Sequence, residues 1–300
     1  MTSKTQNLAQ AETLSAARPP APIPQSVIRK AVRVAMYEDL SDVGDITSAA
    51  TIDATARMEA AIALREPGII SGLDVARSAF SEARGDIQFT AHTEDGQQGD
   101  GGTLLATVTG PARAILAAER VALNFIGRMC GIATLTAAYV GATNDTNATV
   151  VDTRKTTPGL RAFEKYAVRC GGGRNHRFGL FDAVLIKDNH IAACGGIKNA
   201  LTAASQRAGH MTAIEIEVDT LDQLHEVDFN VASCVLLDNM SLEELRQAVA
   251  FVDGRAKTEA SGGINLDTVA DVAATGVDFI SVGALTHSAT VLDVGLDFQK

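Results

Sequence analysis

The sequence predicts an α/β protein whose larger part is a parallel sheet with alternating helices. After about Thr146, six apolar runs each precede a helical or loop segment, and these runs end at Val151, Ile186, Val218, Leu237, Ala260 and Val282. The runs are apolar almost throughout, as is typical of strands covered on both faces. Strands that alternate with helices require a parallel sheet with right-handed crossovers. Six units are fewer than the eight of a closed barrel, so the pattern leaves an open doubly wound sheet possible.

The first hundred residues predict a smaller α+β domain. We expect residues 1–25, which end in RPPAPIP, to be a flexible extension. A helix is expected over 26–38, followed by an acidic, turn-rich segment, EDLSDVGDITS. Residues 57–109 then read as short strands joined by glycine turns, with one helix over 73–83.

A long helix is predicted to start at Pro111. One of its faces carries apolar residues at intervals of three and four, which are Ile115, Ala118, Ala122, Phe125 and Met129. We interpret this stripe as ordinary core. Arg120 projects from the other side of the helix, where a partner surface is expected.

Composition limits the class of protein. The net charge of −10 and the pI near 5.1 argue against nucleic acid as a partner. The four cysteines are far apart and form no C-x-x-C pair, which argues against a zinc site. The N-terminus lacks the apolar segment of a secretory signal, and no uninterrupted apolar run approaches 20 residues. We therefore expect a cytoplasmic protein without a membrane span.

Positive charge is concentrated in one window against the trend of the chain. Between Thr153 and Arg177 there is one anion, Glu164, and seven cations: Arg154, Lys155, Arg161, Lys165, Arg169, Arg174 and Arg177. A polyanionic ligand would offset the self-repulsion of such a cluster, and arginine suits two-pronged binding of carboxylate or phosphate. The alternative is a solvated basic helix face. Two details favour a site: Arg154 directly follows an apolar run, and three glycines precede Arg174.

Polar residues recur at the predicted strand ends, where parallel α/β folds bind ligands. They are Thr153, Arg154, Lys155, Lys187, Asp188, His190, Glu215, Glu217, Asp238, Asn239, Ser261, Gly262, Gly263, Gly283 and His287. Lys187 alone could be a solvated loop lysine. Glu217 and Asp238 could cap the following helices or hold a divalent ion, directly or through water. The glycine turns at the last two strands could cradle a phosphate.

With these residues in view, the chain resembles the quinolinate phosphoribosyltransferases. The resemblance runs from about Val27 to the C-terminus, and its strongest parts are EDLSDVGDITS, ERVALNFIGRMCGIAT, DTRKTTPGLRAFEKYAV, GGGRNHRFGLFDAVLIKDNH, EIEVDT, LLDNM, EASGGI and VGALTHS. It implies an incomplete, about six-stranded α/β barrel over 131–287 and an N-terminal α/β sandwich domain over 26–130, with segment 288–300 packing back on the sandwich.

The resemblance also implies the chemistry and the site. Quinolinate reacts with phosphoribosyl pyrophosphate (PRPP) to give nicotinate mononucleotide, pyrophosphate and CO₂, with Mg²⁺, in a homodimer with shared sites. The quinolinate carboxylates would be held by Arg154, His176, Arg177 and Lys187, with Thr153 beside them and Arg120 from the neighbouring subunit. The PRPP side would be formed by Lys155, Glu217, Asp238, Ser261, Gly262, Gly263, Gly283 and His287. Lys155, Lys187, Glu217 and Asp238 would be catalytic, and Glu217 and Asp238 would face the metal.

Three other functions remain open at this point. Lys187 at a strand end could be the nucleophile of a Schiff-base aldolase. The same scaffold could be a non-catalytic sensor of a phosphate ligand. A phosphoribosyltransferase for another acid, such as nicotinate, would release no CO₂.

Overall fold

The computed structural model describes residues 20–83 and 85–298, and its contacts divide the chain into two compact units. Unit 1 contains the chain up to Leu135, Thr157–Gly172 and the segment from Ala289; unit 2 contains Thr136–Thr156 and Gly173–Ser288. This division places 157–172 in unit 1, whereas the sequence-based boundaries placed them in the barrel. Those boundaries, 26–130 and 131–287, stay a prediction.

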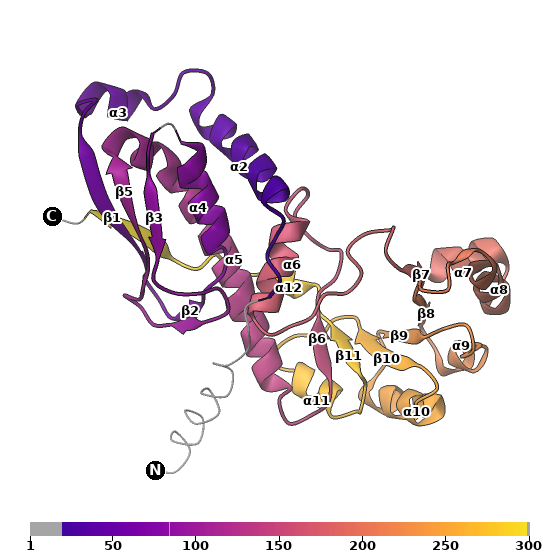
Figure 1. Cartoon of the computed structure of the whole chain (residues 1–300). Helices are drawn as coiled ribbons and strands as arrows, with labels where there is room; N and C mark the ends of the chain where they lie inside the picture. The colour runs from indigo at the N-terminus through magenta and orange to yellow at the C-terminus, as the bar shows by residue number, and fades with distance from the viewer. Residues whose placement is uncertain (1–19, 84, 299–300) are drawn as a thin grey trace, which may run out of the picture. The chain divides into compact units, whose positions relative to one another are not determined.

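Unit 1 is built on an antiparallel sheet whose strands come from both ends of the chain. The strand order is β12-β1-β5-β3, with β12 at Val294–Phe298, β1 at Arg57–Leu64, β5 at Leu104–Pro111 and β3 at Gln88–Ala91. Figure 1 shows β12, in yellow, beside β1. A second, two-stranded sheet pairs β2 (Gly68–Ile69) with β4 (Gln98–Gly99).

Helices complete the sandwich. The helix α4 (Leu73–Glu82) contacts β3, and α2 (Gln25–Leu40) contacts α4. α2 buries Ile28, Val32 and Met36 at intervals of four, as an amphipathic helix does. A short helix, α3 (Ile46–Thr51), occupies part of the segment expected to be turns, and Asp45 caps it by accepting hydrogen bonds from two backbone N–H groups. The predicted α/β sandwich is therefore confirmed.

Residues 20–24 precede α2 and were expected to end a flexible extension. In the structure Ile23 is buried, and Arg169 donates a hydrogen bond of 3.0 Å to the carbonyl of Ala21. This part of the segment is therefore attached to unit 1. The rest of the predicted extension, residues 1–19, lies outside the described residues.

The long helix α5 spans Ala112–Ala142, and its predicted apolar stripe packs inward. The C-terminal segment crosses α5 at Gly127 and Gly131, where a Cβ on Gly131 would lie 1.9 Å from the carbonyl oxygen of Thr290. Of the described helices, α5 is the one long and apolar enough to span a bilayer, but 61% of its most apolar window is buried in the protein. Core helices of soluble proteins have the same length and composition.

Unit 2 is an incomplete α/β barrel. Its six parallel strands are ordered β6-β11-β10-β9-β8-β7 and do not close. They are β6 (Thr149–Val151), β7 (Val184–Ile186), β8 (Ile214–Val218), β9 (Cys234–Asp238), β10 (Lys257–Ser261) and β11 (Phe279–Ser281), so every predicted strand end is correct to within one residue. The order runs in one direction from β7 to β11 and then returns to β6. A doubly wound sheet would instead reverse direction at a switch point, so the barrel is the correct alternative.

Helices follow the strands of unit 2 as the pattern predicted. They are α7 (Asp188–Cys194), α8 (Ile197–Arg207), α9 (Leu221–His225), α10 (Leu242–Val252), α11 (Val269–Ala273) and α12 (Ala284–His287). The segment at Arg174 forms a parallel bridge with Val151 and so continues the sheet beyond β6. The helix α6 (Arg161–Cys170), which follows β6 in the chain, belongs to unit 1.

Candidate active site

A pocket of about 430 Å³ opens at the carboxyl ends of the strands of unit 2. Its volume falls in the range of small-molecule sites. Its lining residues are Thr153, Arg154, Lys155, His176, Arg177, Leu185, Lys187, Glu217, Leu236, Asp238, Glu259, Ser261 and Ser281. Four cations and three carboxylates therefore surround one cavity.

Residues at the carboxyl ends of the strands form two layers because side chains alternate along a strand with a period of two. The outer layer contains Lys187, Glu217, Asp238 and Ser261, at or just beyond the strand ends. The inner layer lies two residues earlier on the same strands and contains Leu185, Glu215, Leu236 and Glu259. A barrel interior is usually packed with branched apolar side chains. Two buried carboxylates in the inner layer therefore mark it as unusual.

The outer layer carries charged and polar contacts. The Lys187 ammonium bonds to the carboxylate of Glu217, whose side chain is 11% exposed. Asp238 accepts a hydrogen bond of 2.6 Å from the amide of its neighbour Asn239. Asn239 has a positive φ of 54°, and its backbone N–H donates to the carbonyl of Ser261. Asn239 thus joins the ends of β9 and β10.

Gly262 permits this close approach of two strand ends. Its φ is 96°, and a Cβ there would lie 2.1 Å from Oδ1 of Asn239. Any other residue would displace Asn239 and with it the partner of Asp238. Gly262 and Gly263 line a second hollow of about 250 Å³, and Ser261 lines both this hollow and the main pocket.

Arg154 and Arg177 face the same cavity from the loops after β6 and before β7. Burial lowers the pKa of Arg177, and the nearby charge of Arg154 lowers it further. The Arg177 guanidinium donates one bond of 3.3 Å to the carbonyl of Ala183, while its buried Nε has no hydrogen-bond partner among the described residues. Two arginines held together in a half-buried pocket favour an anionic ligand.

Lys155 is positioned by its own backbone. Its N–H donates to the hydroxyl of Thr153 at 3.0 Å, and its carbonyl accepts from the hydroxyl of Thr286 at 2.7 Å. Gly283 lies against this lysine, since a Cβ there would be 3.1 Å from both the Lys155 side chain and the His287 ring. The two glycine-containing strand ends, at β10 and β11, therefore border the cationic pocket.

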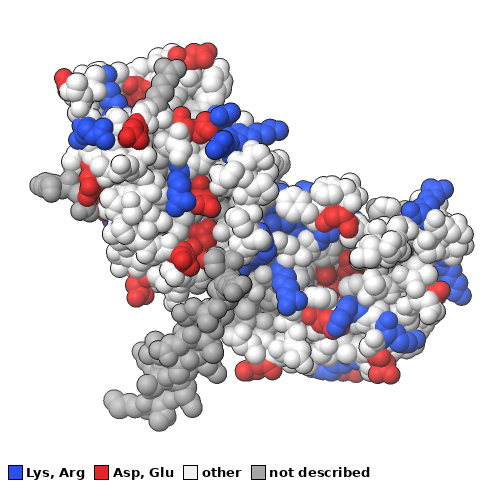
Figure 2. All heavy atoms as spheres, in the orientation of Figure 1, with Lys and Arg blue, Asp and Glu red and all other residues white. Residues whose placement is uncertain are grey.

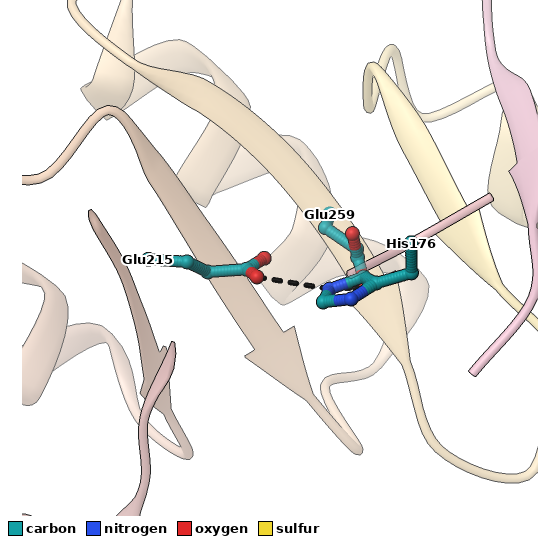
Figure 3. A group of neighbouring side chains, drawn as sticks. All are labelled: His176, Glu215 and Glu259. Carbon is teal, nitrogen blue, oxygen red and sulfur yellow. Dashed lines mark hydrogen bonds and ion pairs between the residues drawn. The ribbon is translucent and has the colours of Figure 1, made fainter. Parts of the chain in front are cut away.

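The two carboxylates of the inner layer, Glu215 and Glu259, lie close to the ring of His176 (Figure 3). Nε2 of His176 lies 2.9 Å from Oε2 of Glu215 and 3.6 Å from Oε1 of Glu259. Glu215 and Glu259 are 8% and 3% exposed, and each has one buried oxygen without a hydrogen-bond partner among the described residues. Burial raises the pKa of Glu259 to about 7, and the charge of Glu215 acts in the same direction.

The structure brings nine of the predicted site residues to this one pocket: Thr153, Arg154, Lys155, His176, Arg177, Lys187, Glu217, Asp238 and Ser261. Gly262, Gly263, Gly283 and His287 lie beside it rather than on its lining. Arg120 is exposed on α5 in unit 1.

The cation-rich window is divided between the two units. Arg161, Lys165 and Arg169 belong to α6 in unit 1, and Arg174 is exposed. Lys165 is 1% exposed, and Arg169 lies over the ring of Tyr166. On the face visible in Figure 2, Lys and Arg are interspersed with Asp and Glu. The members of the window that line the pocket of unit 2 are Arg154, Lys155 and Arg177.

Four lining residues were missed: Leu185, Leu236, Glu259 and Ser281. Each lies two residues before a predicted residue, which is Lys187, Asp238, Ser261 or Gly283, respectively. The period of two, applied backward from Ser261, would have found Glu259. His190 and Asp188 were proposed at a strand end, but His190 is exposed and its Nδ1 accepts the backbone N–H of Lys187 at 3.0 Å.

Comparison with known proteins fits both units. Residues 45–130 match the model of the N-terminal domain of quinolinate phosphoribosyl transferase, and residues 132–297 match that of its C-terminal domain. The chain belongs to the quinolinate phosphoribosyltransferase family. The resemblance seen in the sequence motifs is thereby confirmed.

Members of this family resemble the chain over most of its length. It is 44% identical over 270 residues to a probable nicotinate-nucleotide pyrophosphorylase [carboxylating] of Bacillus subtilis, covering 90% of this chain and 93% of the relative. It is 46% identical over 274 residues to the Mycobacterium leprae enzyme of that name, covering 90% and 96%.

Solved structures of the family share the fold. The nicotinate-nucleotide pyrophosphorylase of Francisella tularensis is 39% identical with a TM-score of 0.87, covering 93% of this chain and 98% of that one. NadC of Streptococcus pyogenes is 38% identical with a TM-score of 0.88, covering 93% and 100%. Human nicotinic acid phosphoribosyltransferase, 13% identical with a TM-score of 0.60, shares the fold alone.

Proposed function

We propose that this chain transfers the phosphoribosyl group of PRPP to quinolinate with loss of CO₂, giving nicotinate mononucleotide and pyrophosphate. The observation that carries the proposal is that Arg154, Arg177 and Lys187, from three separate segments, line one pocket together with Glu217 and Asp238. The family relationship supports the same reaction, because relatives at 44% and 46% identity carry the name nicotinate-nucleotide pyrophosphorylase.

The pocket suits an aromatic diacid. Leu185 and Leu236 supply apolar surface for a ring, and the two arginines supply bidentate donors for carboxylates. The ring nitrogen of quinolinate attacks the anomeric carbon, and the pyrophosphate leaves with the bonding electrons. The enzyme therefore orients the nucleophile rather than providing it. When the C2–carboxylate bond then breaks, its electron pair stays on C2, where the positive charge of the adjacent ring nitrogen stabilises it, and a proton takes the place of CO₂ at C2.

We assign Glu217 and Asp238 of the outer layer, together with Lys155, to the sugar diphosphate. Departure of pyrophosphate builds positive charge on the ribose, which the Glu217 carboxylate stabilises, while Lys155 stabilises the departing oxygens. Ser261 and the glycine turns at Gly262, Gly263 and Gly283, with His287, would contact phosphate. Lys187 forms an ion pair with Glu217. We therefore place Lys187 between the two substrates, where it binds a carboxylate of the diacid next to the ribose.

The residues present fit Mg²⁺. Lys187 contacts one carboxylate oxygen of Glu217, and the amide of Asn239 contacts one carboxylate oxygen of Asp238. Mg²⁺ binds through one or two carboxylates, waters and substrate phosphates rather than in an all-protein cage. Glu217 and Asp238 would hold the ion, directly or through water, and the bound ion would neutralise charge on the diphosphate.

Assembly and location complete the proposal. We infer a homodimer in which the exposed Arg120 of unit 1 reaches the diacid site of the neighbouring subunit. All four cysteines are free thiols, which suits a reducing compartment, and we propose the cytoplasm.

The aldolase alternative is weaker. The pocket also contains the arginines Arg154 and Arg177 and the carboxylates Glu217 and Asp238, which a Schiff-base aldolase does not need. The experiment that separates the alternatives measures pyrophosphate release with PRPP and either quinolinate or nicotinate. Release with quinolinate supports the proposal; release with nicotinate alone favours the other acid, and binding without release favours a sensor.

A further inference from the structure

The hydrogen bonds of His176 fix the position of its proton. Nδ1 accepts the backbone N–H of Arg177 at 2.7 Å, and Nε2 lies 2.9 Å from Oε2 of Glu215. A backbone N–H is a donor only, so Nδ1 must present its lone pair. The ring proton therefore resides on Nε2 and is donated to Glu215, and both ring nitrogens are engaged within the chain.

This tautomer argues against a metal at the cluster of His176, Glu215 and Glu259. The three residues lie close enough to hold an ion, with ligand atoms within 4.8 Å of one another. An imidazole that bound metal through Nε2 would carry its proton on Nδ1. That proton would point at the N–H of Arg177, and two donors would face each other. The cluster is therefore suited to hold a side chain in place.

The segment that carries His176 is held at several points. Asp152, which is fully buried, accepts the backbone N–H of His176 at 2.9 Å and the side-chain amide of Asn175 at 2.6 Å. The carboxylate of Glu215, on β8, points toward the ring of His176 and contacts its Nε2, as Figure 3 shows. The next residue, Arg177, lines the pocket. Glu215 itself does not line the pocket, so it acts through His176.

We propose that Glu215 is a positioning residue of the diacid site: by accepting Nε2–H of His176 it keeps Nδ1 free to accept the Arg177 N–H, and so fixes the arginine that binds a substrate carboxylate. His176 then acts through Arg177 and not by donating to the substrate. This inference rests on the proposed function, because the carboxylate in question belongs to the diacid.

The test compares Glu215→Leu with Glu215→Gln in the full-length enzyme. Leucine removes the acceptor, and we expect the KM for quinolinate to rise about tenfold, as loss of one buried hydrogen bond to the ring would produce. The KM for PRPP should change less than about twofold. Glutamine keeps an acceptor oxygen and should restore the quinolinate KM. Equal KM values for quinolinate in wild type and Glu215→Leu would overturn the inference, as would a failure of Glu215→Gln to rescue.

A second measurement needs no change at Glu215. ¹⁵N NMR of the histidine rings in the free wild-type enzyme, with His176 identified by loss of its signals in His176→Gln, reports the tautomer directly. We expect Nε2 to carry the proton and Nδ1 to have none. A proton on Nδ1, alone or on both nitrogens, would overturn the inference. If the wild-type enzyme does not turn over quinolinate, the proposed function and the site assignment both fail. If it turns over quinolinate normally but the KM comparison or the NMR measurement gives a contradicting result, the positioning role of Glu215 alone is overturned.

Discussion

Arg177 illustrates how a single residue obtains its role from its surroundings. It stands in a run of cations, but its neighbour Arg174 is exposed whereas Arg177 is half-buried with a lowered pKa. An arginine that is partly desolvated beside Arg154 gains more from a bound carboxylate than an exposed one.

Arg177→Ala should therefore raise the KM for quinolinate roughly 10- to 100-fold, since a charge-assisted hydrogen bond contributes about 1.5–3 kcal/mol. The KM for PRPP should change by less than about threefold. Steady-state kinetics with each substrate varied in turn measure both values. Arg174→Ala is the matched control and should leave both KM values near those of wild type. Equal losses for the two substrates in Arg177→Ala would contradict the assignment.

Glu259 provides a prediction about pH. Its pKa in the folded protein is raised to about 7 by burial and by Glu215, against an ordinary value of 4.5. A carboxyl with a raised pKa favours the folded state at low pH, and that contribution is lost as the pH rises from about 4.5 through about 7. Glu259→Gln removes the ionisation.

Chemical denaturation of wild type and Glu259→Gln between pH 5 and pH 8 measures this. The free energy of unfolding of the variant, relative to wild type, should increase as the pH rises, with the largest difference at pH 8. A difference that is constant with pH, or that decreases toward pH 8, would show that Glu259 is ionised throughout.

At the scale of elements, most of the barrel could be predicted from the sequence because its strands are short, mostly apolar except for β10, and regularly followed by helices. The strand ends were found to within one residue, and so were the polar side chains just beyond them. The assignment of α6 to unit 1 could not be predicted from the sequence. Its basic residues follow Arg154 closely in the chain and look like part of the same cluster, but the side chains that α6 contacts lie in unit 1. The main contact of this kind is the ion pair of 2.8 Å between Arg128 and Glu164.

The inner layer of the pocket was harder to predict for a related reason. Within β10, Glu259 lies in the five-residue strand KTEAS, in which Ala260 is the one apolar residue, so no contrast with its neighbours singles out Glu259. His176 gave no sign of its partner, since Glu215 is 39 residues away in sequence. Contacts between such distant residues depend on strand register, which only the folded sheet fixes.

The crossing of α5 by the C-terminal segment yields a test at this scale. Gly131→Ala would place a Cβ 1.9 Å from the Thr290 carbonyl, so the segment must shift, and overpacking of this kind destabilises by about 1–3 kcal/mol. Gly141→Ala in the same helix meets nothing within 4 Å and should be neutral or stabilising by up to about 1 kcal/mol. Thermal or urea unfolding measures the stability of both variants. Similar stabilities of Gly131→Ala and Gly141→Ala would contradict the close packing of the C-terminal segment on Gly131.

At the scale of the whole molecule, the residues assigned to the reaction belong to unit 2 except for Arg120, which is exposed in unit 1. A shared site in a dimer would explain why an arginine of α5 belongs to the family motif. Mixing two inactive variants, one altered at Arg120 and one altered in unit 2, therefore tests whether the site is shared between subunits.

Arg120→Ala and Lys155→Ala should each be nearly inactive alone. Mixed and allowed to exchange subunits, they should regain up to about a quarter of wild-type activity, because half of the dimers are mixed and each mixed dimer has one intact site. Lys155→Ala mixed with Arg154→Ala is the control. Both residues belong to unit 2, so each site in a mixed dimer keeps one of the two changes and the mixture should stay inactive. No recovery in the first mixture would place Arg120 in the site of its own subunit or outside any site.

The central claim is that cations from separate segments bind an aromatic diacid beside a sugar diphosphate. The most direct measurement follows pyrophosphate and CO₂ together, using PRPP, Mg²⁺ and quinolinate labelled at the 2-carboxylate. We predict that labelled CO₂ and pyrophosphate appear in equal amounts and that nicotinate gives neither pyrophosphate nor product. Pyrophosphate release with nicotinate but not with quinolinate would contradict the account.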